Sequence, residues 1–178
     1  MKTHKLTTIG LLTAILCILG PIAIVLPFSP VPVSLGTLGV LLVCLLSGAK
    51  NGTLCTMLYL FLGLAGLPVF SGFTGGVGRL LGPTGGYMLG YLFLALIGGH
   101  LASLWKKHLP LQALGLLIGM CICYLFGTLW LAYQSNMRFE AALWAGVIPY
   151  VPFDVAKIGA AQVLSKAISR RLYLKNNI

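Results

Sequence analysis

An acidic and a basic residue stand within an otherwise apolar stretch near the C-terminal end of the sequence. Residues 147–162 read VIPYVPFDVAKIGAAQ, which puts Asp154 three positions before Lys157. Residues three apart lie on one face of an α-helix, so the two side chains are predicted to be neighbours. A carboxylate accepts hydrogen bonds and an ammonium donates them. The pair therefore offers both halves of a polar binding site.

The composition surrounding this pair is that of a membrane protein. The 178-residue chain is 58% hydrophobic and 8% charged, with a mean hydropathy of +0.99. At the centre of a membrane helix a single Asp or Lys costs about 2.5 to 3.5 kcal/mol. A charge pair within a span is therefore interpreted as a functional site, and an internal ion pair that only joins helices is the alternative.

Six apolar runs predict an all-α, polytopic integral membrane protein, a single domain over residues 1–178. The predicted spans are residues 6–26, 34–47, 52–67, 83–104, 112–133 and 141–167. Gly20 and Pro21 are expected to bend the first span, and residues 27–32 are expected to form an uncharged loop. A charged turn at residues 48–52 is expected between the second and third spans.

The basic residues predict the orientation of the chain. Nine of the twelve lie on the side of the two termini, and only Arg79 and Arg138 fall on the other side. By the positive-inside rule both termini are cytoplasmic, and the loops after spans one, three and five face outward. Because the basic residues are not interleaved with exposed aromatic residues, the net charge of +10 indicates topology rather than nucleic-acid binding.

A glycine-rich stretch covers residues 63–90, with ten glycines in 28 positions. Irregular backbone at membrane depth must be buried in protein or line a cavity, so this stretch is predicted to fold over a pocket. Neither G-x-G-x-x-G nor G-x-x-x-x-G-K-[ST] occurs, which argues against an ATP site within the chain.

The sequence gives little support for a disulfide, a metal site or an enzyme active site. The five cysteines all fall within apolar runs, where a thiol behaves as a small apolar group, so neither a disulfide nor a metal site is predicted. Two acidic residues are too few for a metal-dependent transferase, and no nucleophile and base are arranged for a hydrolase. We therefore expect no enzyme activity, no catalytic residue, no metal and no cofactor.

Small residues four apart predict two sites of close helix packing. They are Gly10 and Ala14 in the first span, and Gly115 and Gly119 in the fifth. Such strips let a neighbouring helix approach closely.

Four segments together resemble the BioY family, the biotin-binding S component of energy-coupling factor (ECF) transporters. They are Val31-Pro-Val33, residues 68–76 with Gly75-Gly76, the string LGPTGGY at 81–87, and Pro152-x-Asp154-x-x-Lys157. The resemblance extends over nearly the whole chain. It implies a multi-pass subunit of the bacterial plasma membrane that captures biotin from outside. Its implied partners, besides the lipid bilayer, are a membrane coupling (T) protein and two cytoplasmic ATPases.

The resemblance also implies roles for particular residues. Asp154 and Lys157 would hold the ureido ring of biotin, assisted by a polar residue of the glycine-rich loop. Some relatives are expected to have asparagine there, and this chain has Thr74, next to Gly75. The strip of Gly10 and Ala14 would meet the coupling protein.

The chemistry of biotin can be matched to this site. Its ureido group presents N–H donors to Asp154 and a carbonyl acceptor to Lys157. The aromatic residues expected to cover its rings are Phe73, Tyr87, Tyr150 and Phe153. The groups expected to receive its carboxylate are Arg79, Ser34 and the N–H groups around Gly85. The reverse pose, with Lys157 on the carboxylate, stays open.

Two alternative functions also remain. One is an S component for a different small vitamin. The other is an ion-coupled carrier that uses Asp154 as a relay, whose uptake would depend on membrane potential rather than on partner ATPases. The sequence leaves open whether the ECF module is dedicated or shared, whether the chain transports alone, and its oligomeric state.

Overall fold

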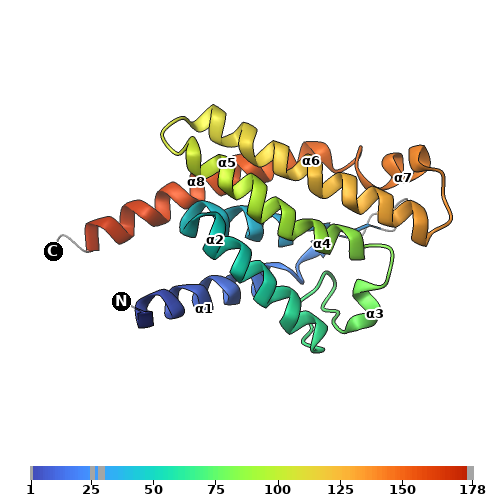
Figure 1. Cartoon of the computed structure of the whole chain (residues 1–178), viewed down its shortest axis with the longest axis horizontal. Helices are drawn as coiled ribbons and strands as arrows, with labels where there is room; N and C mark the ends of the chain where they lie inside the picture. The colour runs from blue at the N-terminus through green and yellow to red at the C-terminus, as the bar shows by residue number, and fades with distance from the viewer. Residues whose placement is uncertain (1, 25–26, 28–30, 176–178) are drawn as a thin grey trace.

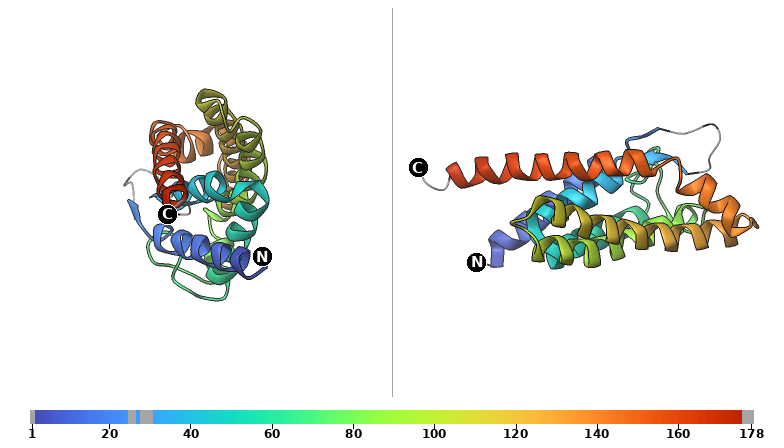
Figure 2. Two further views of the ribbon diagram at one scale, coloured as in Figure 1. Left: turned by 90° about the vertical axis from the view of Figure 1, so that its left-hand side faces the viewer. Right: turned by 90° about the horizontal axis from the view of Figure 1, so that it is seen from above.

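The computed structural model describes residues 2–24, 27 and 31–175, which form an elongated bundle of helices (Figure 1). The elements are α1 (Lys2–Leu19), β1 (Ala23–Ile24), β2 (Val33–Ser34), α2 (Gly36–Leu64), α3 (Val77–Leu80), α4 (Gly85–Phe93), the π-helix η1 (Leu94–Gly98), α5 (Gly99–Leu104), α6 (Leu109–Gln134), α7 (Phe139–Gly146) and α8 (Val151–Lys175). Helix α1 begins and α8 ends at the same end of the bundle, as an even number of crossings requires (Figure 2).

The first helix is shorter than predicted. It ends at Leu19 rather than near residue 26, and the chain continues into β1, which pairs antiparallel with β2. Gly20 allows this close turn, since a Cβ on it would lie 2.4 Å from the carbonyl oxygen of Val69. Most of the loop expected at residues 27–32 lies outside the described residues.

The second and third predicted spans are two arms of one helix, α2. The two arms meet at Gly48, with φ 77° and ψ 172°, and the chain folds back there, since a Cβ on Gly52 would lie 3.0 Å from the Cα of Cys44. The turn expected at residues 48–52 is therefore present but confined to Gly48. Glycine adopts this conformation without the strain that a side chain brings. Both arms stay helical up to this one-residue break, so they satisfy backbone groups that a longer turn would leave without helical partners.

The fourth span is helical over three consecutive elements, α4, η1 and α5, and lies against α6. It begins at Gly85, two residues later than predicted, because Pro83 and Thr84 form a turn. The strip expected around Gly119 is confirmed as a close contact: a Cβ there would lie 2.6 Å from the Cα of Gly98. Backbone meets backbone at this point of the bundle.

The last predicted span is broken. Helices α7 and α8 are separated at residues 147–150 and bent by 48°, whereas a single span over 141–167 was expected. Pro149 and Pro152 bound the break, because proline lacks the N–H that a continuous helix needs. Pro152 lies in the first turn of α8, where the missing N–H costs no hydrogen bond.

Three helices of the described residues are long and apolar enough to cross a membrane, or four if the bent pair counts as one span. They are Gly36–Leu64, Gly85–Leu104 and Leu109–Gln134, with Phe139–Gly146 and Val151–Arg170 as the pair. The apolar part of α1, Lys5–Leu19, is shorter. The mainly helical membrane fold is thus confirmed, while the count of six spans and the cytoplasmic termini stay predictions.

A core of buried side chains joins α8, which carries the charge pair, to the neighbouring helices. Leu16 of α1, Val40 of α2, Leu94 of η1, Leu116 of α6 and Ile158 of α8 belong to one cluster. This packing holds the first turns of α8 beside α2 and α6.

Candidate functional site

A cleft lies where the start of α8 meets the first arm of α2 and α6. It has about 410 Å³ of atom-free space, its open mouth included. Its polar lining comes from Ser34, Thr37, Asp154 and Lys157, and its apolar and aromatic lining includes Val31, Tyr87, Tyr91, Met120, Cys123, Tyr124 and Tyr150. Segments more than 100 positions apart in the sequence therefore meet in one site.

The predicted neighbours Asp154 and Lys157 form a buried ion pair at this cleft. The Nζ of Lys157 lies 2.8 Å from Oδ1 of Asp154, and their side chains are 11% and 8% exposed. The ammonium also donates to the carbonyl oxygen of Ser34 at 2.7 Å and to Oγ1 of Thr37 at 2.9 Å. An ammonium has three N–H donors, so the protein itself coordinates the cation fully.

Asp154 has a second oxygen with a different partner. The hydroxyl of Tyr124 donates to Oδ2 at 2.5 Å, while Thr37 Oγ1 lies 3.4 Å from Oδ1. An ionised carboxylate accepts at about four lone-pair positions. Asp154 therefore keeps acceptor capacity for a ligand while it is held by Lys157 and Tyr124.

Tyr124 and Thr37 were not predicted from the sequence. Each is one hydroxyl within an apolar helix, and they lie 30 and 117 positions from Asp154. The only signal in the sequence is a polar group inside a span, which is too common to identify a site.

Two tyrosines of the lining are fixed by hydrogen bonds to backbone. Tyr87, a predicted site residue, lines the cleft and donates to the carbonyl oxygen of Gly146 at 3.1 Å. Its ring packs so closely on Gly127 that a Cβ there would lie 2.1 Å from a ring atom. Tyr150, also expected as a wall, donates to the carbonyl oxygen of Val31. The aromatic wall is therefore rigidly placed.

A second cavity of about 370 Å³, its mouth included, adjoins the cleft and contains the predicted residue Arg79. The two cavities share Val31, Pro32, Ser34, Tyr87 and Tyr91. Nε of Arg79 and Oγ1 of Thr84 are buried and have no hydrogen-bond partner among the described residues. Leaving a buried donor unpaired is costly, so these atoms indicate where a ligand acceptor belongs.

The other groups expected to receive an anion are already bonded within the protein. Ser34 donates its hydroxyl to the carbonyl oxygen of Gly20 and accepts from the N–H of Gly36. The N–H of Gly85 donates to the carbonyl oxygen of Gly82. Arg79 and Thr84 are therefore better suited to an anion than Ser34 or Gly85.

Thr74 and Gly75 line neither cavity. The hydroxyl of Thr74 donates to the carbonyl oxygen of Ser71, and a Cβ on Gly75 would lie 2.3 Å from the carbonyl oxygen of Leu67. Both contacts hold the glycine-rich loop in shape, and direct ligand contact by these residues stays a prediction. Phe73 and Phe153 are 71% and 51% exposed and do not line the cleft, contrary to their expected role as walls.

The predicted partner-binding residues do not line the cleft. Gly10 and Ala14 are both exposed on α1. A Cβ on Gly10 would have no neighbouring atom within 4 Å. At Gly10, α1 is therefore open to the approach of another helix.

Metal-ligating groups are scattered. Among the residues that the structure describes, no three His, Cys, Asp or Glu side chains are grouped so that they could hold a metal ion. All five cysteines are free thiols.

Comparisons with known proteins identify the family of this chain. A family model described as the BioY family matches residues 1–173. The chain is 36% identical over 172 residues to "Biotin transporter BioY2" of Lactococcus lactis subsp. cremoris, covering 96% of this chain and 93% of that protein. It is 34% identical to "Biotin transporter BioY" of Thermotoga maritima, covering 94% of this chain and 96% of that protein.

A solved structure shares the fold. The crystal structure at 2.1 Å of the S-component for biotin from an ECF-type ABC transporter matches with a TM-score of 0.86 and 30% sequence identity. The match covers 95% of this chain and 92% of that one.

Proposed function

The chain belongs to the BioY family, and from this premise we propose that it is the biotin-binding S component of an ECF-type transporter in the bacterial plasma membrane. The family model confirms the resemblance to the BioY family that the sequence motifs indicate. Membership of a transporter family agrees with a transport subunit rather than an enzyme. The observation that carries the proposal is the buried ion pair of Asp154 and Lys157 beside a cleft.

The ureido ring of biotin is assigned to the ion pair. Its N–H groups donate to the carboxylate of Asp154, which has acceptor positions beyond those used by Lys157 and Tyr124. The ureido oxygen takes one N–H of Lys157, in exchange for the bond to Thr37 or Ser34. Hydrogen bonds to charged groups contribute about 1.5 to 3 kcal/mol each.

The carboxylate of biotin is assigned to the second cavity. Arg79 carries a positive charge there, and its Nε and the hydroxyl of Thr84 lack partners within the described part of the chain. The positions of Arg79 and Thr84 in the second cavity favour the pose with the ureido ring at Asp154 over the reverse pose, in which the carboxylate lies on Lys157. The apolar ring and side chain of biotin then lie between the two polar ends, along Tyr87 and Tyr91, which line both cavities.

The transport partners belong to the proposal as well. An S component has no ATP site, so a membrane coupling protein and two cytoplasmic ATPases supply the energy. The exposed strip of Gly10 and Ala14 is the surface assigned to the coupling protein, because small residues let a helix approach closely.

Equilibrium binding of a vitamin panel to the purified chain tests this function. Biotin should bind saturably at one site, whereas riboflavin and thiamine at the same concentrations should not compete. Tighter binding of another vitamin, or no binding of biotin by folded protein, would contradict the assignment of biotin.

A further inference from the structure

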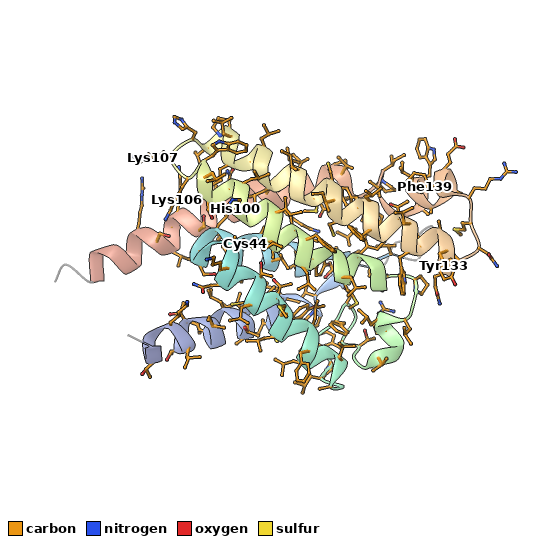
Figure 3. All side chains as sticks on the ribbon, in the orientation of Figure 1. Cys44, His100, Lys106, Lys107, Tyr133 and Phe139 are labelled. Carbon is orange, nitrogen blue, oxygen red and sulfur yellow. The ribbon has the colours of Figure 1, made fainter. Side chains whose placement is uncertain are left out.

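A groove that is separate from the cleft and from the second cavity lies at the end of the bundle where α1 begins and α8 ends. It has about 560 Å³ of atom-free space, its mouth included, and none of its lining residues lines the cleft. The lining consists of Ala49, Lys50, Leu96, Ile97, His100 and Leu101. Figure 3 shows His100 at this end of the bundle, with Lys106 and Lys107 nearby.

Three backbone features form this groove. The kink at Gly48 turns the second arm of α2, whose first residues include Ala49 and Lys50. The π-helix η1 supplies Leu96 and Ile97, and π-helical turns are frequent at functional sites. Gly99 permits the close approach of α5 to α2, since a Cβ there would lie 3.3 Å from the Cα of Ala49. The groove is therefore built by the main chain.

No acidic side chain is among the residues that line the groove. The chain has only two acidic residues, and Asp154 is paired with Lys157 while Glu140 lies in α7, at the other end of the bundle (Figure 1). Lys50 is exposed at the groove, and Lys106 lines a neighbouring cavity across the kink. Lys50 therefore gives the groove a positive edge beside its apolar wall, which suits an anionic ligand.

We propose that the groove binds an anionic phospholipid. One acyl chain packs against Leu96, Ile97 and Leu101, and the phosphate accepts hydrogen bonds from Lys50 and His100. Basic pockets between membrane helices bind anionic headgroups in this way. The apolar wall distinguishes a lipid from free phosphate, because only a lipid has a chain to cover it. This site is separate from the biotin cleft and does not depend on the function proposed for it.

Native mass spectrometry of the purified full chain, titrated with lipid, tests the proposal. Phosphatidylglycerol should bind more tightly than phosphatidylcholine with the same acyl chains. Lys50→Met should weaken phosphatidylglycerol binding about fivefold, the effect expected for one lysine near an anionic surface. The matched control is Lys5→Met on α1, which removes the same charge outside the groove and should bind phosphatidylglycerol as the unchanged protein does.

A second variant tests the acyl contact. Leu96 is 50% exposed, so Leu96→Gln should fold and still weaken phosphatidylglycerol binding by making the wall polar. Glycerol phosphate should not displace the lipid. The proposal is overturned if both lipids bind equally, if Lys50→Met matches Lys5→Met, if Leu96→Gln has no effect, or if glycerol phosphate alone fills the site.

Discussion

Lys157 donates its three N–H groups to Asp154, Thr37 and Ser34. The protein itself therefore coordinates this buried cation. The hydroxyl of Tyr124 donates a hydrogen bond to the second carboxylate oxygen of Asp154. A polar site that is held in place by its own neighbours spends little binding free energy on ordering side chains. This rigidity fits a subunit whose task is to capture a ligand.

Arg79→Gln tests the assignment of the ligand carboxylate. The change removes a charged hydrogen bond, so the affinity for biotin should fall about 10- to 150-fold, as 1.5 to 3 kcal/mol implies. Binding of biotin methyl ester, which lacks the negative charge, should change much less. Isothermal titration calorimetry with both ligands measures the difference.

The control for Arg79 is Arg138→Gln, because Arg138 is exposed before α7 and lines neither cavity. It should bind biotin as the unchanged protein does. If Arg79→Gln binds biotin as tightly as Arg138→Gln, the carboxylate lies elsewhere, and the reverse pose on Lys157 becomes the better account.

The sequence predicts the part of the site that is local in the chain. Asp154 and Lys157 are three residues apart on one helix, so their contact follows from helix geometry. Tyr124 and Thr37 reach Asp154 only through tertiary packing, which no local pattern encodes. Thr84 has an unpaired hydroxyl only because the turn at residues 83–84 buries it.

Among the helices, the contact of α6 with the fourth span sets the position of the cleft wall. Gly98 and Gly119 meet with almost no space between them, and Tyr87 packs on Gly127 further along the same pair. Interiors packed this closely do not accept added atoms without a shift of the backbone.

Gly119→Ala tests this close contact. The added Cβ would lie 2.6 Å from the Cα of Gly98, so unfolding free energy should fall by about 1 to 3 kcal/mol. Gly159→Ala is the matched control, since a Cβ there meets no atom within 4 Å. It should be neutral or slightly stabilising, because alanine favours helix. Thermal unfolding in detergent compares the two variants, and equal stability would refute the packing argument.

The element boundaries were predicted less well than the elements themselves. Apolar length identifies the two arms of α2 and the turn between them, but not that the turn is confined to Gly48 while Lys50 and Asn51 already belong to the second arm. Likewise, apolar length predicts one span over residues 141–167, whereas Pro149 and Pro152 lie at a break that leaves α7 and α8 bent by 48°.

Over the molecule as a whole, the surface proposed to bind the ligand is separate from the surface proposed to meet the partner. Asp154 lines the cleft and Arg79 lines the adjoining cavity, whereas Gly10 and Ala14 lie on an exposed face of α1 and line neither. Ligand capture and assembly with partners should therefore respond to different mutations.

Gly10→Leu tests this separation. A leucine on the exposed strip should keep a partner helix away, at a cost of about 1 to 3 kcal/mol, and reduce co-purification of the coupling protein by roughly fivefold or more. Biotin binding should be unchanged. Cys121→Leu places the same side chain on an exposed position of α6 and serves as the control. Equal recovery of the coupling protein with both variants would remove α1 from the interface.

The most direct test of the account is the affinity of Asp154→Asn for biotin, measured by calorimetry on protein whose thermal unfolding shows that it is folded. Glu140→Gln is the matched control, because it neutralises the only other acidic residue, which is exposed on α7. Loss of hydrogen bonds to the ionised carboxylate should lower the affinity of Asp154→Asn by about 10- to 150-fold and leave Glu140→Gln unchanged. An Asp154→Asn protein that binds biotin as tightly as Glu140→Gln would contradict the claim that the buried ion pair holds the ligand.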